Sequence, residues 1–348
     1  MKVQLAIIIF SIFCICSCGD TPDIKDAPDV DHIEVADVVF VRYDKLVQAM
    51  DTLDIKGSYN SLLSEHPNIT KLYFDELLNF KSESQDSFLF YVNEFVKAEP
   101  IVELQKMVDK KYPNTKSIEK DLNKAQKYFK YYFPLAEMPV FYTYITEFGY
   151  QTIIFNDGDY DGIGIGLDLY LGEGFDYKKV DPRNPVFSDY LTRSYNEEHI
   201  VRNVMELITS DIMGEPKGQK MLDQMIFNGK RLYIMEKLLP WVSDSIILEQ
   251  SSDNFTWLEN SELQIWDYFL EQDLIYETSH LKINKYLNPS PHSPGMPKEA
   301  PGQTATYIGW KIVHAYMKRH PESSPLDLLS LTDSQKLLEL SKYKPKRR

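Results

Sequence analysis

The chain has 348 residues and a formal net charge of −14 at pH 7, so its surface is expected to repel nucleic acid and anionic lipid headgroups. Hydrophobic residues make up 43% of the sequence and aromatic residues 13%, which is enough to build a sizeable core in one large domain or two modest ones. After the N-terminus there is no second long apolar run, and nothing else in the sequence is expected to span a membrane.

The N-terminus has the features of a bacterial lipoprotein signal peptide. Lys2 precedes an almost uninterrupted apolar run over residues 3–15, which is too short to span a membrane but suits a signal-peptide core. The run ends in Ile15-Cys-Ser-Cys18-Gly, which resembles a lipobox, with an aliphatic residue at −3 and a small residue at −1. We therefore expect residues 1–17 to be removed and Cys18 to be lipidated. An ordinary signal peptide with incidental cysteines is the alternative.

Cysteine usage limits the chemistry of the mature chain. The three cysteines are Cys14, Cys16 and Cys18. If cleavage precedes Cys18, the body has no disulfide, no thiol nucleophile and no cysteine metal ligand. A protein with a core of this size does not require a disulfide.

Three segments are expected along the rest of the chain. Residues 18–37 are rich in acidic residues and contain two prolines, so we expect a flexible acidic tether. The folded body should begin near the apolar run at residues 38–41 and continue as a single, predominantly helical domain over residues 38–340. Residues 341–348 form a basic tail.

The first half of the body is expected to be helical. Residues 60–110 favour helices that are interrupted at Pro67 and Pro100. Ser117 is expected to cap the next helix. Its apolar face consists of Ile118, Leu122, Ala125 and Phe129.

The spacing of apolar residues then changes to that of β-strands. Apolar residues begin to alternate at Val140 and alternate again over residues 163–171, and residues 152–155 are rich in β-forming residues. The last two segments flank a turn-rich linker at residues 157–162. This arrangement predicts an antiparallel β-hairpin.

Helical periodicity returns in the C-terminal half. Ser194 and Glu197 have the spacing of a capping box. The helix that follows has Ile200, Val204, Leu207 and Ile208 on one face. Further helices are expected at residues 219–239, 259–270 and 304–320. The chain as a whole is therefore predicted to be mainly α with a small antiparallel β element, an α+β fold.

The hairpin turn is a candidate calcium site. Asp157, Asp159 and Asp161 match the first half of an EF-hand loop, and Asp168 falls at the twelfth position, where an EF-hand has a bidentate Glu. However, strands flank this turn instead of helices, and Asp is one carbon shorter than Glu. We therefore expect a polar turn, with a calcium site as the alternative.

Other common catalytic motifs are missing from the sequence. There is no His-Glu-x-x-His, no Gly-x-Ser-x-Gly and no phosphate-binding loop. His199 is expected on the solvated face of its helix with Arg202, Asn203 and Glu206. Four tryptophans are expected in the core, with an exposed sugar-binding platform as the alternative. They are Trp241, Trp257, Trp266 and Trp310.

Several short segments carry a resemblance to a known family. After Cys18 they lie at residues 40–44, 131–134, 165–172, 228–230, 238–240, 301–302 and 309–313. In this order, over nearly the whole chain, they resemble the GldB family of gliding-motility lipoproteins of Bacteroidetes. Gln303 departs from the pattern, which has a basic residue after Pro-Gly. The resemblance implies an envelope lipoprotein needed for gliding, a process tied to type IX secretion.

The order of a β-hairpin, two helices and a Gly-Trp helix is also similar to that of zincin-type zinc peptidases. In those enzymes the first helix carries His-Glu-x-x-His and the second carries a Glu ligand beside a Gly. The corresponding residues here are Met205, Glu206 and Thr209, then Asn228. Met, Thr and Asn cannot replace the zinc ligands, so the resemblance implies a scaffold that has lost its metal. Alternatively, Glu206 is a surface residue paired with Arg202 at i−4.

These expectations combine into one hypothesis. The chain is expected to be a lipid-anchored protein of the cell envelope, in the outer membrane facing the periplasm. It would bind other envelope or gliding-machinery proteins, without nucleic acid, cofactor or catalysis. A zinc-type peptidase or hydrolase with an unrecognised site, and a glycan-binding lipoprotein, are the alternatives.

Overall fold

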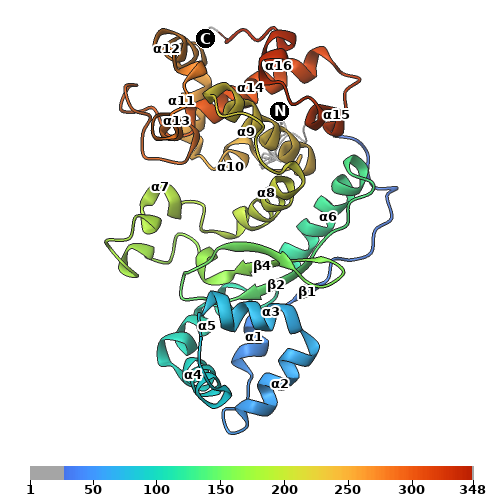
Figure 1. Ribbon diagram of the computed structural model, residues 1–348, viewed down its shortest axis with the longest axis vertical. Coiled ribbons are helices and arrows are strands. Elements are labelled where there is room, and N and C mark those ends of the chain that lie inside the picture. Colours follow the sequence, from blue (N-terminus) through green and yellow to red (C-terminus); the bar gives the residue numbers. More distant parts are fainter. Residues whose placement is uncertain (1–26, 347–348) are drawn as a thin grey trace, which may run out of the picture.

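The computed structural model describes residues 27–346. Cys18 and the predicted signal peptide lie outside the described residues. A four-stranded sheet crosses the middle of the elongated molecule and separates a smaller helical part from a larger one (Figure 1). The prediction of a mainly helical chain with a small sheet is confirmed.

The smaller part contains the first helices of the chain. They are α1 (Tyr43–Gln48), α2 (Ile55–Glu65), α3 (Pro67–Lys71), a π-helical segment (Leu72–Leu77), α4 (Gln85–Lys97) and α5 (Glu99–Lys111). Both predicted interruptions are present, because Pro67 and Pro100 occupy the first turns of α3 and α5. Proline fits there because the first N–H groups of a helix have no intrahelical acceptor.

The sheet is mixed. It contains β1 (Phe40–Val41), β2 (Val140–Tyr144), β3 (Thr152–Asn156) and β4 (Asp161–Gly166), in the order β1-β2-β4-β3. The predicted hairpin is confirmed as the antiparallel pair of β3 and β4. The expectation of a purely antiparallel element was wrong, because β2 pairs in parallel with both β1 and β4. Parallel neighbours need long crossover connections, and local alternation does not reveal them.

The two faces of the sheet serve two different cores. Phe141 and Ile163 pack into the larger core, whereas Tyr142 and Tyr144 pack into the smaller one. Side chains of successive strand residues point to opposite faces, so the alternation in β2 supplies both. At Gly164 a Cβ atom would lie 2.4 Å from the ring of Tyr144. The glycine therefore makes room for an aromatic ring of the smaller core.

The larger part holds most of the remaining helices. They are α6 (Lys116–Tyr132), α7 (Asp189–Thr192), α8 (Ile200–Met213), α9 (Met221–Leu238), α10 (Asp244–Ile247), α11 (Ser252–Asn260), α12 (Glu262–Glu271), α13 (His280–Leu287), α14 (Thr304–Arg319), α15 (Pro325–Ser330) and α16 (Ser334–Ser341). Helices α9 and α14 cross with their backbones in contact. A Cβ atom on Gly229 would lie 2.4 Å from the backbone of Gly309, so this crossing requires glycine.

Several predicted boundaries differ from those in the structure. Helix α6 begins at Lys116 after Thr115, so Ser117 is not its cap. Ser194 donates its hydroxyl to the Leu191 carbonyl, and α8 begins only at Ile200. The helix expected at residues 259–270 is instead two helices, α11 and α12. The last strand ends at Gly166 and continues as the 3-10 helix Leu167–Tyr170.

Both ends of the described chain pack against the body. Val30, within the expected tether of residues 18–37, is only 5% exposed and belongs to the larger core. Within the expected tail of residues 341–348, the Tyr343 hydroxyl donates to Glu262 at 3.0 Å. The tether and the tail are therefore shorter than the composition predicts. Over residues 27–346, no helix has both the length and the apolar character needed to cross a membrane.

Candidate functional site

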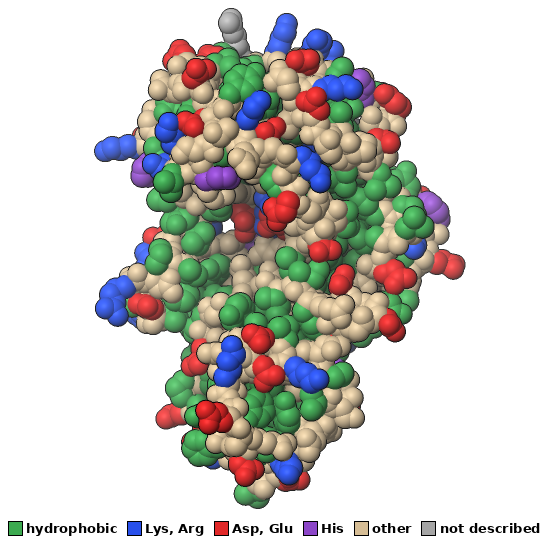
Figure 2. Space-filling model, viewed as in Figure 1, with side chains coloured by type: hydrophobic (Ala, Val, Ile, Leu, Met, Phe, Trp, Pro, Cys, Tyr) green, Lys and Arg blue, Asp and Glu red, His purple; other side chains and the backbone are tan. Residues whose placement is uncertain are grey.

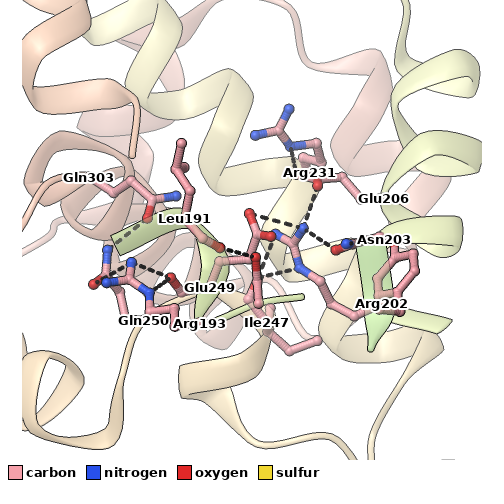
Figure 3. Close-up of polar contacts among 12 residues, drawn as sticks. Leu191, Arg193, Arg202, Asn203, Glu206, Arg231, Ile247, Glu249, Gln250 and Gln303 are labelled. Carbon is pink, nitrogen blue, oxygen red and sulfur yellow. Dashed lines mark hydrogen bonds and ion pairs between the residues drawn. The ribbon is translucent and has the colours of Figure 1, made fainter. Parts of the chain in front are cut away.

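A cluster of charged side chains lies between α8, α9 and the segment that joins α10 to α11. Figure 2 shows a hollow near the middle of the molecule, with charged side chains inside it. Figure 3 shows how Arg202, Glu206, Arg231 and Glu249 converge on one another from these three segments. Such a convergence of buried charge in a recess is the strongest candidate site in the described part of the chain.

Arg202 is the centre of the cluster. Its side chain, on α8, is only 2% exposed. Nε and Nη2 donate to the Ile247 carbonyl at 3.1 and 2.9 Å. Nη1 faces the carboxylates of Glu206 and Glu249 and the side-chain oxygen of Asn203. The guanidinium is thus fixed by a carbonyl on one side and by two carboxylates on the other.

Glu206 is held between two guanidinium groups. It accepts a hydrogen bond from Arg202, and its second oxygen lies 3.4 Å from Nε of Arg231. Burial opposes ionisation of this carboxyl, but Arg202 and Arg231 outweigh burial and lower its pKa. Glu206 is therefore an ionised carboxylate with its charge already neutralised inside the protein.

Glu249 is the opposite case. Burial and the neighbouring Glu206 raise the pKa of Glu249, although Arg202 acts against them. Its backbone adopts the left-handed conformation, with φ at 55°. Its carbonyl accepts hydrogen bonds from Nε and Nη2 of Arg193 at 3.1 and 2.6 Å. Arg193 thus stabilises the left-handed backbone at Glu249, which places the Glu249 carboxylate next to Arg202.

A buried pair of glutamines closes the cluster towards α14. Gln250 donates from Nε2 to Oε1 of Gln303 at 2.7 Å, and both side chains are buried. Gln303 also has a positive φ, 64°, directly before α14. A basic residue was expected at this position from the family pattern. Arg193 already lies beside Gln250. Gln303 accepts the hydrogen bond from Gln250 without adding a further positive charge next to Arg193.

His199 does not lie on a solvated face. It is buried, and its Nδ1 contacts the side-chain oxygen of Asn196 at 2.9 Å. Burial, together with the positive charges of Arg202 and Arg193, lowers the pKa of His199 to about 4. The imidazole is therefore neutral at physiological pH. The expectation of a solvated polar face on α8 was wrong, because Arg202 and Asn203 are buried as well.

The structure disperses the positions that correspond to zinc ligands. Met205 is fully buried in the larger core. Thr209 is also buried, with its hydroxyl lacking a hydrogen bond. Asn228 donates to Thr306 at 3.3 Å. Of the four, only Glu206 belongs to the charged cluster, and its predicted pairing with Arg202 is present.

No group of three or more His, Cys, Asp or Glu side chains over residues 27–346 is arranged to hold a metal ion. At the candidate calcium turn, Asp157 accepts hydrogen bonds from Tyr142 at 2.6 Å and from Asn68 at 3.2 Å. Asp168 is fully buried and accepts from backbone N–H groups of Thr146 and Phe148 at 3.0 and 2.7 Å. Its carboxylate stabilises the turn between β2 and β3.

The tryptophans form no exposed platform. Trp310 is buried, and Trp241, Trp257 and Trp266 are partly buried against the larger core. This agrees with the expectation of core residues. Stacking of a sugar ring requires an open aromatic face, so this observation does not favour the glycan-binding alternative.

Glu249, Arg193 and Arg231 are site residues that the sequence did not reveal. Arg202 and the Ile247 carbonyl are 45 positions apart, so periodicity could not connect the two segments. The only local signal was the i, i+4 spacing of Arg202 and Glu206. In chemical terms, the cluster can fix the two segments to each other and present a guanidinium, that of Arg231, at its edge.

Comparisons with known proteins identify the chain at the level of the family. The family model described as gliding motility protein GldB matches residues 23–345. No curated protein and no solved structure matches the chain. The expected likeness to zincin-type peptidases therefore has no support from a solved structure.

Proposed function

The chain belongs to the GldB family of gliding motility proteins, and from this premise we propose that it is a lipid-anchored envelope protein that supports gliding without catalysis. In this proposal the folded body binds other proteins of the gliding machinery. The family gives the role in gliding, and the mechanism is our inference from the charged cluster.

The absence of catalysis is proposed from one observation. Glu206 is the only acidic residue at a position that corresponds to zincin catalysis, and it is bound by Arg202 and Arg231. A general base needs a free lone pair and a pKa near the working pH, whereas these arginines lower the pKa of Glu206. Glu206 is thus better suited to joining α8 and α9 than to accepting a proton from water.

The anchor is the second part of the proposal. Cys18, in its lipobox, carries the lipid, and the mature chain begins there. Nine positions separate it from residue 27, so the connecting chain can span at most roughly 30 Å. The body is then held close to the membrane surface. We place it at the outer membrane on the periplasmic side, where it would act together with type IX secretion.

Metal analysis of the purified protein tests the absence of catalysis. We expect no stoichiometric zinc after purification without chelators, because Met205, Thr209 and Asn228 offer no zinc-binding set. We also expect no cleavage of peptide or glycoside substrates. The matched sample is the Glu206→Gln variant. Near one zinc per chain, together with a hydrolytic activity that this variant loses, would replace the proposal with the hydrolase alternative.

A further inference from the structure

An open groove lies on the smaller part of the molecule, between α2, the π-helical segment and the start of α4. It has a volume of about 470 Å³ and is lined by Tyr59, Asp75, Phe80, Glu83 and Phe88, among others. A volume of this size can hold one long side chain together with its neighbouring backbone. The groove is separate from the Arg202 cluster, which lies in the larger part.

Three aromatic rings line the groove around a fourth. Phe74 is fully buried. Its ring centroid lies 5.7 Å from that of Tyr59 and 6.3 Å from those of Phe80 and Phe88. Phe80 and Phe88 are only partly buried against the smaller core, so their rings are in contact with the groove. Aromatic rings attract cations to their faces, because the face carries partial negative charge.

The backbone beside the groove is unusual. Phe74 and Asp75 lie in the π-helical segment Leu72–Leu77. Asn79 then adopts a left-handed conformation, with φ at 53°, and the N–H of Phe80 donates to the Phe74 carbonyl at 2.9 Å. The chain thus turns back and places the Phe80 ring beside the Phe74 ring. Segments of π-helix are rare and occur frequently at functional sites.

The carboxylate of Asp75 is unpaired. Burial and the negative charge of Glu76 raise the pKa of this partly buried group, while Lys71 acts against them, and no hydrogen bond contributes. Within residues 27–346, Asp75 also forms no ion pair. Glu83 and Lys81, which line the groove as well, are both exposed. Three carboxylates and two amines therefore lie around the groove, and Asp75 is left without a direct counter-ion.

The groove lies far from the point where the chain enters the body. Val30 packs into the larger core, so the chain from the proposed anchor at Cys18 enters through the larger part. Helices α2 and α4, which carry Tyr59 and Phe88, lie at the other end of the elongated molecule (Figure 1). The groove is therefore more accessible to another protein than to the membrane that holds the anchor.

We propose that this groove binds an arginine side chain in a basic segment of another envelope protein, with Asp75 as its counter-ion and the aromatic rings against its guanidinium. A guanidinium stacks on aromatic rings and pairs with a carboxylate through two hydrogen bonds, which an ammonium cannot do. The net charge of −14 favours a basic partner as well. This inference rests on the proposed function, in which the body binds other proteins.

A pair of short peptides tests the proposal. The probe is acetyl-Gly-Leu-Arg-Leu-Gly-amide carrying a fluorescent label, and the reference peptide has citrulline, which is uncharged and nearly the same shape, in place of arginine. The full mature chain is titrated into each peptide, and binding is followed by fluorescence anisotropy. We expect wild type to bind the arginine peptide at least about fivefold more tightly than the citrulline peptide.

The variant is Asp75→Asn, which keeps the shape of the side chain and removes its charge. We expect it to bind the two peptides about equally. The matched control is Glu94→Gln, which changes the net charge by the same amount. Glu94 lies on α4, where it is exposed and pairs with Lys97 at 2.9 Å. This control should keep the preference of wild type for the arginine peptide.

Two results would overturn the proposal. In one, wild type binds both peptides equally or binds neither. In the other, Asp75→Asn keeps the preference for arginine. If Asp75→Asn does not fold, Phe80→Leu serves instead, because it removes one ring and keeps an apolar side chain. Undiminished binding by that variant would overturn the proposal equally.

A lipid headgroup with an ammonium group is a different class of ligand. Vesicles of phosphatidylethanolamine are therefore added to the Cys18→Ser chain, which has no lipid of its own. Vesicle binding that requires Asp75, without binding of the arginine peptide, would overturn the proposal of a protein partner.

Gliding of Asp75→Asn cells separates this proposal from the proposed function. The peptide titration requires neither gliding nor the anchor, so its failure would overturn the groove and leave the role in gliding intact. If the peptides bind as expected, Asp75→Asn cells with wild-type protein levels should glide more slowly. Gliding at wild-type speed would overturn the assignment of the groove to a partner in gliding.

Discussion

Each part of the molecule contains one cluster of buried charge, and the two clusters compensate their buried charge in different ways. In the smaller part Asp44 has a fully buried side chain and is paired with Arg42 at 2.7 Å. In the larger part Arg202 is the buried ion, and its partners Glu206 and Glu249 are 25% and 22% exposed. The buried ion is thus an anion, Asp44, in the smaller part. In the larger part it is a cation, Arg202, whose carboxylate partners are in contact with water.

The Asp44 cluster is saturated. One oxygen of Asp44 accepts from Nε of Arg42 at 2.9 Å and from the Thr143 hydroxyl. The other accepts from Nη2 of Arg42 and from Gln105 at 2.7 and 2.9 Å. Burial raises the pKa of Asp44, but these donors reverse the effect and lower it. The carboxylate of Asp44, on α1, thus connects α1 to β2 through Thr143 and to α5 through Gln105, so this cluster has a structural role.

The Arg202 cluster is not saturated. The guanidinium groups of Arg202 and Arg231 contact the carboxylates of Glu206 and Glu249, and that of Arg193 donates to the Glu249 carbonyl. Nε of Arg231 is buried without a hydrogen bond of good geometry. The Asp44 cluster thus has a donor for each of its acceptors, whereas the Arg202 cluster, which lies at a hollow, leaves a buried donor without a well-formed hydrogen bond.

Removing one carboxylate from each cluster should produce the largest difference. Asp44→Asn is expected to lower the free energy of unfolding by about 3–5 kcal/mol, because it leaves Arg42 largely buried with only the half-exposed Asp109 as a counter-ion. Glu249→Gln should cost less than about 1 kcal/mol, because burial and Glu206 already favour the uncharged form of Glu249. Chemical denaturation of both variants measures the two values.

The control for this comparison is Asp109→Asn. Asp109 also contacts Arg42, at 3.3 Å, but its side chain is 42% exposed. Its removal should change stability by less than about 1 kcal/mol. Equal losses for Asp44→Asn and Glu249→Gln would show that the two clusters do not differ as described.

Acidification should act on the Arg202 cluster through His199. An unfolded histidine titrates near 6.5, whereas the pKa of folded His199 is about 4. Between these values the unfolded chain binds a proton that the folded chain does not, so stability falls as the pH is lowered through this window. The loss is up to roughly 3 kcal/mol at pH 4. Denaturation of wild type and of His199→Gln from pH 7 to pH 4 measures it.

Asp168 titrates in the opposite sense and must be separated from His199. Burial raises its pKa to about 6, so its contribution to stability increases as the pH falls through the same range. The difference between wild type and His199→Gln cancels this contribution, because both carry Asp168. Exposed His280 supplies the control variant, His280→Gln. A difference that stays constant with pH would contradict a buried, neutral His199.

Much of the fold was predictable because the spacing of apolar residues over short stretches of sequence indicates the type of element they form. The apolar face of α6 and the hairpin of β3 and β4 follow from spacings of three, four and two residues. The parallel pairs of β2 were not predictable, since Phe40 and Phe141 pair across 101 positions. No local pattern encodes that register.

The candidate site was only partly predictable for the same reason. The sequence placed His199, Arg202, Asn203 and Glu206 on one polar face of a helix. Arg202, Asn203 and Glu206 do lie on α8, but His199 precedes its first residue. It could not show whether this face meets water or other polar groups. The Ile247 carbonyl at the end of α10 and Glu249 after it come from a distant part of the chain and cover this face, so periodicity alone gave the wrong environment.

Gliding of cells that carry single-residue variants tests the central claim most directly. The sole copy of the gene carries either Glu206→Gln or Cys18→Ser, and protein levels are matched by immunoblot. We predict that Glu206→Gln cells glide at wild-type speed, because Glu206 performs no proton transfer, whereas Cys18→Ser cells lose gliding together with the lipid anchor. A folded, lipidated Glu206→Gln protein at wild-type level in cells that cannot glide would contradict the account.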